Sequence, residues 1–103
     1  RTGLYSPAQS SPEQLDQLER HDCPELFVLL SGRVTLVIAE DGRLREVTLQ
    51  PGQPVMVHAP HNGYCPDGAH AGTALVVERD RFDTEYRPLL QWLGEGAADE
   101  RDR

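Results

Sequence analysis

The sequence predicts one all-β domain, a small sandwich or barrel of short antiparallel strands, from three observations. Apolar runs recur along the chain with turn-forming residues between them, at the spacing of roughly 8 to 12 residues that is typical of such folds. The run 34–38, VTLVI, is rich in β-branched residues, which favour strands. Asp41-Gly42 joins two polar–apolar stretches and is a strong signal for a hairpin turn. A chain of 103 residues is long enough for one domain only.

The first 18 residues are predicted to be an arm that precedes the barrel. Residues 1–10 are polar and contain Gly3 and Pro7, so we expect them to be loose. Ser11, Pro12 and Gln14 predict a short helix, with serine as the cap, proline at the first helical position and glutamine closing a capping box.

Residues 19–80 are predicted to form the barrel core. The expected strands cover residues 26–30, 34–38, 46–49, 54–57 and 73–78. Residues 58–73 contain two prolines and three glycines, which predict a loop or a strongly bent edge strand.

Residues 81–93 are predicted to pack against the barrel or against a second copy of the chain. Short helical turns are expected at 83–86 and 89–93, on either side of Pro88. Trp92 and its leucine neighbours are too apolar to remain in water. Residues 94–103 are charged and lack apolar weight, so we expect them to be a disordered acidic tail.

Charge and composition exclude several classes of function. The net charge is −7, which argues against nucleic acid and anionic membranes as partners. All ten basic residues are arginine, so this chain has no lysine for Schiff-base chemistry. No apolar run is long enough to span a bilayer. The chain has two cysteines and no recognisable signal peptide, so a cytoplasmic location is expected. The two cysteines are also compatible with a disulfide, and further residues can precede Arg1 in the full protein.

Potential ligands for a metal gather at residues 19–29. If this stretch is extended, alternate side chains share one face. That face carries Glu19, His21, Cys23, Glu25, Phe27 and Leu29. If the helix that starts at Pro12 continued through Glu19, however, Glu19 would not share that face.

The stretch resembles the first motif of the cupin superfamily, H-x-H-x(3,4)-E-x(6)-G. His21, Glu25 and Gly32 fit its second half without a gap, while glutamate stands at position 19 where the motif has its first histidine. Pro51-Gly52, Pro60 and His61 resemble the second motif if its loop is shortened. The resemblance covers residues 19–78 and implies a small jelly-roll barrel with short helical turns at both ends.

This resemblance implies a divalent transition metal, Zn, Mn, Fe, Ni or Cu, held by His21, Glu25 and His61. Imidazole nitrogen and carboxylate oxygen suit all of these ions. Glu19 or Cys23 is a possible substitute for the missing histidine. The alternative interpretation is a hydrogen-bonded pair of His21 and Glu25 at the rim of the barrel, without a metal.

Other candidate residues lie mainly in the segment after the expected strand at 54–57. Pro60 interrupts the alternation, so the sequence does not decide whether His58 or His61 points inward, and only the motif favours His61. Tyr64 is a candidate catalytic acid, with a packed barrel tyrosine as the alternative. His70 is expected to be solvated, and Cys23 to be an inert buried residue.

Three functional interpretations follow. The first is a cupin that binds a metal and a small-molecule ligand at the mouth of the barrel. The second is a metal-free isomerase or epimerase of a sugar-like substrate, with His21 or His61 as the base; residues 79–93 faintly resemble the end of small cupins that isomerise nucleotide-linked keto sugars. The third is a non-catalytic binding module that works through the apolar tail around Trp92. The resemblance also implies a homodimer.

Overall fold

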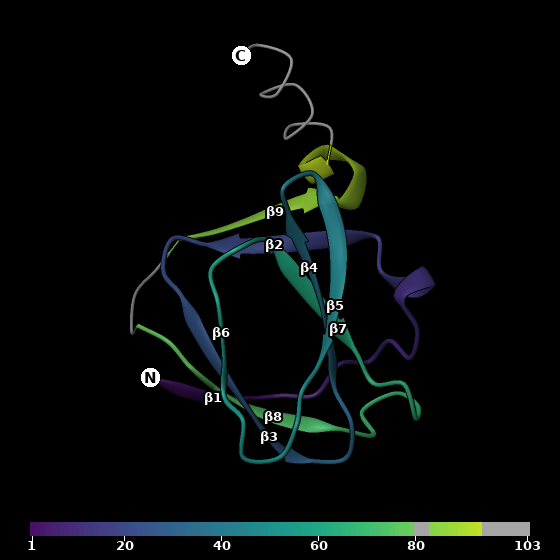
Figure 1. Ribbon diagram of the computed structural model, residues 1–103, viewed down its shortest axis with the longest axis vertical. Helices are drawn as coiled ribbons and strands as arrows, with labels where there is room; N and C mark the ends of the chain where they lie inside the picture. Colours follow the sequence, from purple (N-terminus) through teal and green to yellow (C-terminus); the bar gives the residue numbers. More distant parts are fainter. Residues whose placement is uncertain (80–82, 94–103) are drawn as a thin grey trace.

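Two antiparallel sheets face each other in the described part of the chain, which is residues 1–79 and 83–93 of the computed structural model (Figure 1). The four-stranded sheet has the order β1 (Thr2–Tyr5), β8 (Thr73–Val77), β3 (Glu25–Ser31) and β6 (Val55–Val57). The five-stranded sheet has the order β5 (Arg43–Thr48), β4 (Thr35–Glu40), β7 (His61–Tyr64), β2 (Gln17–His21) and β9 (Thr84–Pro88). This arrangement confirms the prediction of a small all-β fold.

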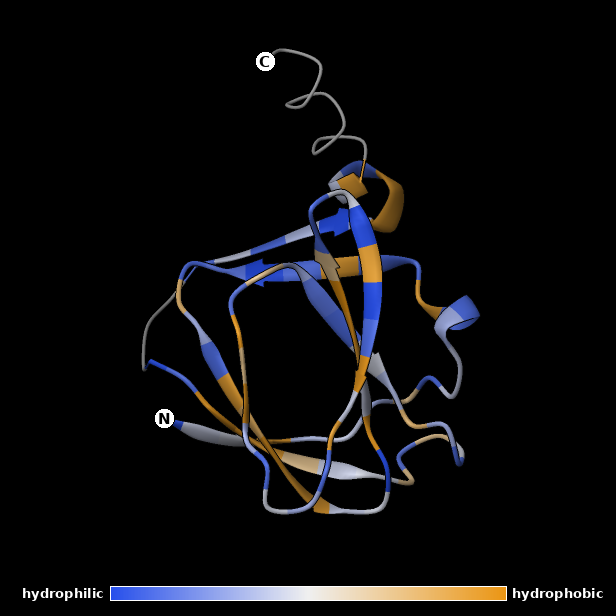
Figure 2. Ribbon diagram, viewed as in Figure 1, coloured by the Kyte–Doolittle hydropathy of each residue, from blue (hydrophilic) through white to orange (hydrophobic). Residues whose placement is uncertain are grey.

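The main core lies between the sheets. Strands β3 and β4 carry hydrophobic residues along most of their length (Figure 2), and β4 is buried on both faces from Thr35 to Ala39. A strand that is covered on both faces needs a continuous apolar run, which explains why the alternation is lost in this segment. The buried core residues are Phe27, Val34, Leu36, Ile38, Leu49, Val57, Cys65, Ala74 and Val76.

Two turns have the backbone geometry that their residues suggest. Asp41 and Gly42 have φ values of 55° and 74°, so both central residues of the β4–β5 hairpin are left-handed, as in a type I′ turn. Gly32, after β3, has a φ of 65°, and a Cβ at this position would lie 2.1 Å from the carbonyl oxygen of Ala71. The chain approaches itself too closely there for any residue with a side chain.

The N-terminal segment is more ordered than the sequence suggests. Residues Thr2–Tyr5 form β1 and pair with β8, so the expectation of a loose arm was wrong for these residues. Pro12–Gln14 form a single 3-10 turn, η1, in which Ser11 makes no side-chain cap. The Gln14 side chain instead accepts a hydrogen bond from the Ser10 backbone at 2.7 Å.

Residues 19–29 form two strands, not one. β2 ends at His21 and β3 begins at Glu25, and the two strands belong to different sheets. Because η1 ends at Gln14, Glu19 lies in β2 and not in a helix. The chain therefore turns a corner between sheets inside the motif, and this corner brings Glu25 to face the residues of β2.

Two other segments differ from expectation. β7 is an interior strand between β4 and β2, although residues 58–73 were predicted to be a loop or an edge strand. Thr84–Pro88 form β9, which pairs along all of β2, so the helical turn expected at 83–86 was wrong. Backbone pairing with a neighbouring strand decided the structure of both short polar segments, against their local propensity.

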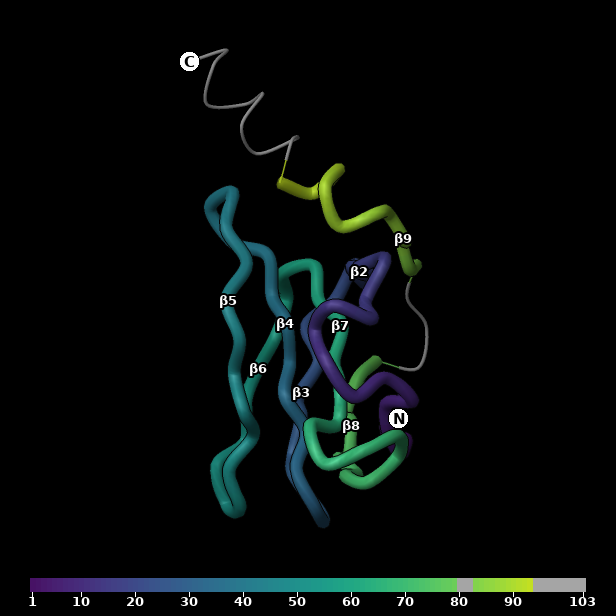
Figure 3. The backbone as a smooth tube through the Cα atoms, turned by 90° about the vertical axis from the view of Figure 1, so that its right-hand side faces the viewer, coloured from purple at the N-terminus to yellow at the C-terminus, as the bar shows by residue number. Residues whose placement is uncertain are grey.

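A short helix over residues 89–93 ends the described chain beside β2 and β9 (Figures 1 and 3). Trp92 packs on Leu18 and Ala39, donates its indole N–H to the Leu18 carbonyl at 3.2 Å, and is 7% exposed. Trp92 therefore packs on its own barrel and is not an open working surface. The tail predicted at 94–103 lies outside the described residues. Among the described residues, no helix has the length and apolar character that crossing a membrane requires.

Candidate metal centre

The site begins with a row of side chains across the five-stranded sheet. Ile38, His61, Glu19 and Tyr86 stand opposite one another on β4, β7, β2 and β9. Directly opposed residues of an antiparallel pair point to the same face, with Cβ atoms about 4.5–5.5 Å apart. Ile38 and His61 are buried between the sheets, so the row points into the barrel.

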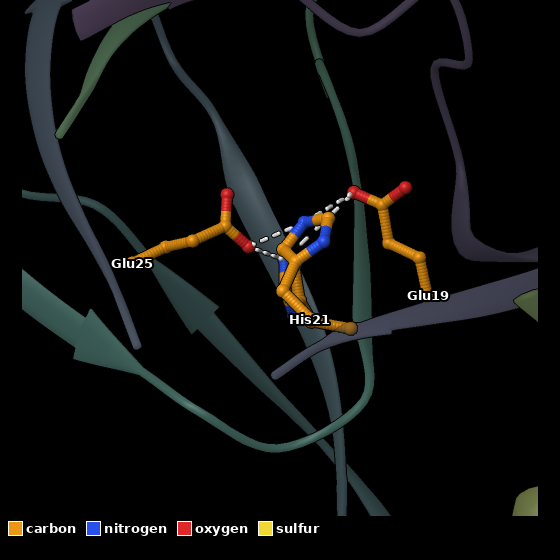
Figure 4. Close-up of side chains that lie close together, drawn as sticks. Glu19, His21 and Glu25 are labelled. Atoms are coloured by element: carbon orange, nitrogen blue, oxygen red, sulfur yellow. Dashed lines mark ion pairs between the residues drawn. The ribbon is translucent and has the colours of Figure 1, made fainter. Parts of the chain in front are cut away.

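Two further residues complete the cluster. His21 lies two residues after Glu19 on the same face of β2, and its Nδ1 lies 2.7 Å from the hydroxyl of Thr84 on β9. Glu25 is the first residue of β3 and approaches from the opposite sheet. One donor atom from each of Glu19, His21, Glu25 and His61 lies within 4.8 Å of all the others. Figure 4 shows Glu25 and Glu19 on either side of His21.

The shortest distances in the cluster converge on one carboxylate oxygen. Glu25 Oε1 lies 2.8 Å from His21 Nε2 and 2.9 Å from His61 Nε2. Two donor atoms that lie about 2.1 Å from one ion at a right angle are about 3.0 Å apart. The spacing of these three atoms therefore fits ligands of a shared transition-metal ion.

The burial of these atoms supports the same interpretation. Glu25 is 4% exposed and His61 is 3% exposed. Glu25 Oε1 and His61 Nε2 nevertheless have no hydrogen-bond partner of acceptable geometry among the described residues. Since a buried polar atom without a partner costs about 1–3 kcal/mol, these two atoms need a shared proton or a shared metal ion.

The orientation of His61 is determined by the backbone. Its Nδ1 lies 2.9 Å from the carbonyl oxygen of Ala59, which can only accept a hydrogen bond, so Nδ1 carries the proton. In the neutral ring Nε2 is then unprotonated, and its lone pair points at the cluster. A ring N–H bonded to a backbone carbonyl is the usual support of a metal-binding histidine.

The electrostatics couple His61 to Glu25. Burial by itself would lower the pKa of His61, but close contact with the Glu25 carboxylate outweighs burial and raises it above 6.5. Burial by itself would raise the pKa of Glu25, but the two imidazoles outweigh burial and hold that pKa below 4.5. Without a metal, the pair therefore favours an imidazolium next to a carboxylate.

A pocket of approximately 320 Å³ adjoins the cluster. Its size falls within the range of about 300–1,000 Å³ that is typical of small-molecule sites. Glu19, His21 and Glu25 form part of its wall, together with Tyr5, Val76, Glu78, Thr84 and Tyr86. A molecule in this pocket would lie beside Glu19, His21 and Glu25, whereas His61 is not part of the pocket wall.

The structure brings together the three residues predicted as metal ligands, His21, Glu25 and His61. Of the two possible substitutes for the missing histidine, Glu19 belongs to this cluster and Cys23 does not. Of the two histidines that the sequence left open, His61 points inward and His58 is exposed. His70 is also exposed, and its ring donates a hydrogen bond to the Ser6 carbonyl at 2.7 Å.

Tyr64 and the cysteines lie apart from the cluster. Tyr64 is three residues after the inward-facing His61 in β7, so it stands on the other face of the sheet, and its hydroxyl donates to Glu46. Its catalytic role stays a prediction. Cys23 and Cys65 are both buried and free.

Four further residues that line the pocket, Tyr5, Glu78, Thr84 and Tyr86, were not predicted from the sequence. Tyr5 lies in the segment expected to be loose, and Thr84 and Tyr86 lie in the segment expected to be helical. The alternation of Thr84, Tyr86 and Pro88 on one face is the one signal that could have revealed β9.

Comparison with known proteins points to one group of enzymes. A comparison with models of known protein families finds no match. The chain is 32% identical over 69 residues to the 3-hydroxyanthranilate 3,4-dioxygenase of Xanthomonas campestris pv. campestris strain B100, a match that covers 67% of this chain and 38% of the relative. It is 30% identical over 84 residues to the protein of the same name from Meyerozyma guilliermondii, covering 79% of this chain and 47% of the relative.

The protein is cupin-like and distantly related to these dioxygenases. Their fold is the cupin fold, and the two facing antiparallel sheets of this chain are consistent with it. The chain spans less than half the length of these curated relatives.

Proposed function

We propose that this protein binds a divalent transition metal through His21, Glu25 and His61 and acts on a small molecule in the adjoining pocket. The observation that carries the proposal is the convergence of two imidazole nitrogens on one buried carboxylate oxygen, at 2.8 and 2.9 Å. Two histidines and one carboxylate are the donor set of non-haem iron(II) oxygenases, which keep positions open on the metal.

Iron(II) is the ion that we propose for this centre. The donor set favours iron(II), and the curated relatives are named as dioxygenases. Because the chain covers less than half of the length of these relatives, a dioxygenase activity is part of the proposal. When bound, the ion would supply Lewis-acid and oxygen-activating chemistry. Zn, Mn, Ni and Cu also suit imidazole and carboxylate donors, so loading must be measured.

The residues of the chain itself would hold and orient the reacting groups. Ala59 fixes the His61 ring through its carbonyl, and Thr84 contacts the ring of His21. Tyr5 forms an edge-to-face contact with Phe27, with ring centroids 5.9 Å apart, and borders the pocket. These contacts hold the donors in place and cover one side of the centre with apolar groups, which limits the access of water.

The proposal is tested by metal content. The protein is purified without a histidine tag, and its metal is measured before and after anaerobic incubation with Fe(II), Mn(II), Zn(II) or Ni(II). We expect near-stoichiometric uptake by the wild type. His61→Ala should lose most of this affinity, because it removes one of three ligands.

The control is His58→Ala, which removes an exposed histidine three residues away and should bind as the wild type does. Circular dichroism should show the same β fold in both variants. A folded wild type that takes up none of the four metals would refute the proposal. Metal uptake that His61→Ala leaves unchanged would refute the ligand assignment.

We also propose that two copies of the chain associate through the outer face of the four-stranded sheet. The outward positions of its strands carry no charge, although 26% of all residues are charged. These positions are Thr2, Leu4, Leu26, Val28, Leu30, Met56, Thr73, Leu75 and Val77. A second copy supplies a matching uncharged apolar face by two-fold symmetry, and keeps the carboxylates of an acidic chain out of the contact.

A further inference from the structure

Glu19 occupies a distinct position in the cluster. It stands between His61 and Tyr86 in the row across the five-stranded sheet. Its side chain is 32% exposed, whereas those of His21, Glu25 and His61 are 8%, 6% and 4% exposed. Glu19 therefore lies at the boundary between the buried donors and the pocket.

The distances place the Glu19 carboxylate in range of the same ion. Glu19 Oε1 lies 3.5 Å from His21 Nε2 and 3.9 Å from His61 Nε2. Donor atoms about 2.1 Å from one ion are about 3.0 Å apart at a right angle, about 3.4 Å at the tetrahedral angle and about 4.2 Å when opposite each other. Both distances thus lie within the range found between ligands of one ion.

A second observation supports an ion at this position and does not involve Glu19. Glu25 Oε1 and His61 Nε2 are each more than nine-tenths buried, point into the cluster and have no hydrogen-bond partner there. An ion that satisfies these two atoms would lie in the space between the two sheets. Glu19, which lines the pocket, lies on the side of His21 opposite to Glu25 (Figure 4).

We propose that Glu19 is a fourth protein ligand, so that the centre has two imidazole and two carboxylate donors. This inference rests on the proposed metal centre and deepens it. The two carboxylates together balance the charge of a divalent ion. Four protein donors leave two positions of a six-coordinate ion open, where three would leave three. A chelating ligand and any further molecule would then compete for the same two positions.

Tyr86 is the residue placed to orient this fourth ligand. It faces Glu19 directly from β9 and lines the same pocket. The Tyr86 hydroxyl is a hydrogen-bond donor, and the Glu19 carboxylate opposite it is an acceptor. Such a bond to a ligating carboxylate is the usual way in which a ligand of this type is held.

The experiment uses Mn(II) as the probe and has two readouts, affinity and the number of water molecules on the ion. Affinity comes from titration calorimetry, and the water count from electron–nuclear double resonance in ¹⁷O-labelled water. For Glu19→Ala we expect affinity to fall at least about tenfold and one additional water to bind Mn(II). Glu19→His returns a donor atom and should keep the wild-type water count.

The matched control is Glu85→Gln, which removes a carboxylate from β9 that pairs with Arg20 at 3.0 Å and should change neither readout. If the wild type binds Mn(II) and Glu19→Ala has the same affinity and water count, Glu19 is not a ligand and the three-ligand centre stands. If the wild type binds none of Mn(II), Fe(II), Zn(II) and Ni(II), the metal centre itself is refuted, and this inference with it.

Discussion

A single backbone carbonyl decides the chemistry of His61. Because Ala59 accepts the Nδ1 proton, the Nε2 of a neutral His61 ring can only be an acceptor or a ligand. His61 Nε2 lies 2.9 Å from Oε1 of Glu25, which is also an acceptor when ionised. Two acceptors that face each other in a buried site require a proton or a metal ion between them. In the metal-free protein a proton can take this place, and close contact with the Glu25 carboxylate raises the pKa of His61.

The raised pKa predicts how metal binding depends on pH. The ion must displace the proton on His61, so affinity should fall as the pH drops below the raised pKa of His61, and uptake at such a pH should release protons. Calorimetric titrations with Zn(II) in buffers of different ionisation enthalpy measure that release. Affinity that does not change across neutral pH would contradict the assignment of the proton to His61.

The shifted pKa values also predict how the stability of the metal-free protein depends on pH. A raised histidine pKa stabilises the folded state fully below 6.5, and this stabilisation is lost as the pH rises through the folded value. The lowered pKa of Glu25 acts in the opposite direction, with stabilisation present above 4.5 and lost as the pH falls through the folded value. The stabilisation of the protein by added metal should therefore increase with pH, as melting curves with and without Zn(II) would show.

The elements of the fold could be predicted where local chemistry decides them. Asp41-Gly42 dictates its turn by backbone conformation, and the β-branched run before it dictates a strand. β7 and β9 could not be predicted, because they are polar sequences of only four and five residues. β7 becomes a strand because it has neighbouring strands on both sides, and β9 because it pairs along the whole of β2. The site was predicted in composition from the motif, but its geometry depends on the corner between β2 and β3, which no periodicity signals.

The C-terminal helix is held on the barrel by Trp92. Trp92 fills a second, smaller core with Leu18 and Ala39, and the guanidinium groups of Arg20 and Arg87 lie 5.1 and 4.8 Å from its ring centroid. Trp92→Ala should lower the free energy of unfolding by about 3–5 kcal/mol, because it leaves a cavity and loses the indole hydrogen bond.

Urea denaturation measures this change, and Leu90→Ala is the control. Leu90 lies on the same helix but is 78% exposed, so its loss should change stability by no more than about 0.5 kcal/mol. Equal effects of the two substitutions would show that the helix does not hold the barrel through Trp92.

At the scale of the whole molecule, the two sheets differ in what covers them. The C-terminal helix packs on Leu18 and Ala39 of the five-stranded sheet, while Leu4, Leu30 and Met56 on the outside of the four-stranded sheet are 74%, 54% and 62% exposed. Sequence alone could not reveal this difference, because LFVLL is apolar on both faces. Only the fold shows which face has no covering element among the residues that the structure describes. This outer face belongs to the same sheet whose inner face supplies Glu25.

Association through this face predicts a dimer in solution that a single charge disrupts. Light scattering coupled to size-exclusion chromatography should give twice the mass of the chain for the wild type. Met56→Glu should give a monomer, because two-fold symmetry places the new carboxylate in the contact twice. Leu44→Glu is the control, since Leu44 is 39% exposed on β5 of the other sheet and should leave the dimer intact. A wild type that is monomeric at every concentration, or a Met56→Glu variant that stays dimeric, would show that copies of this chain do not meet through this face.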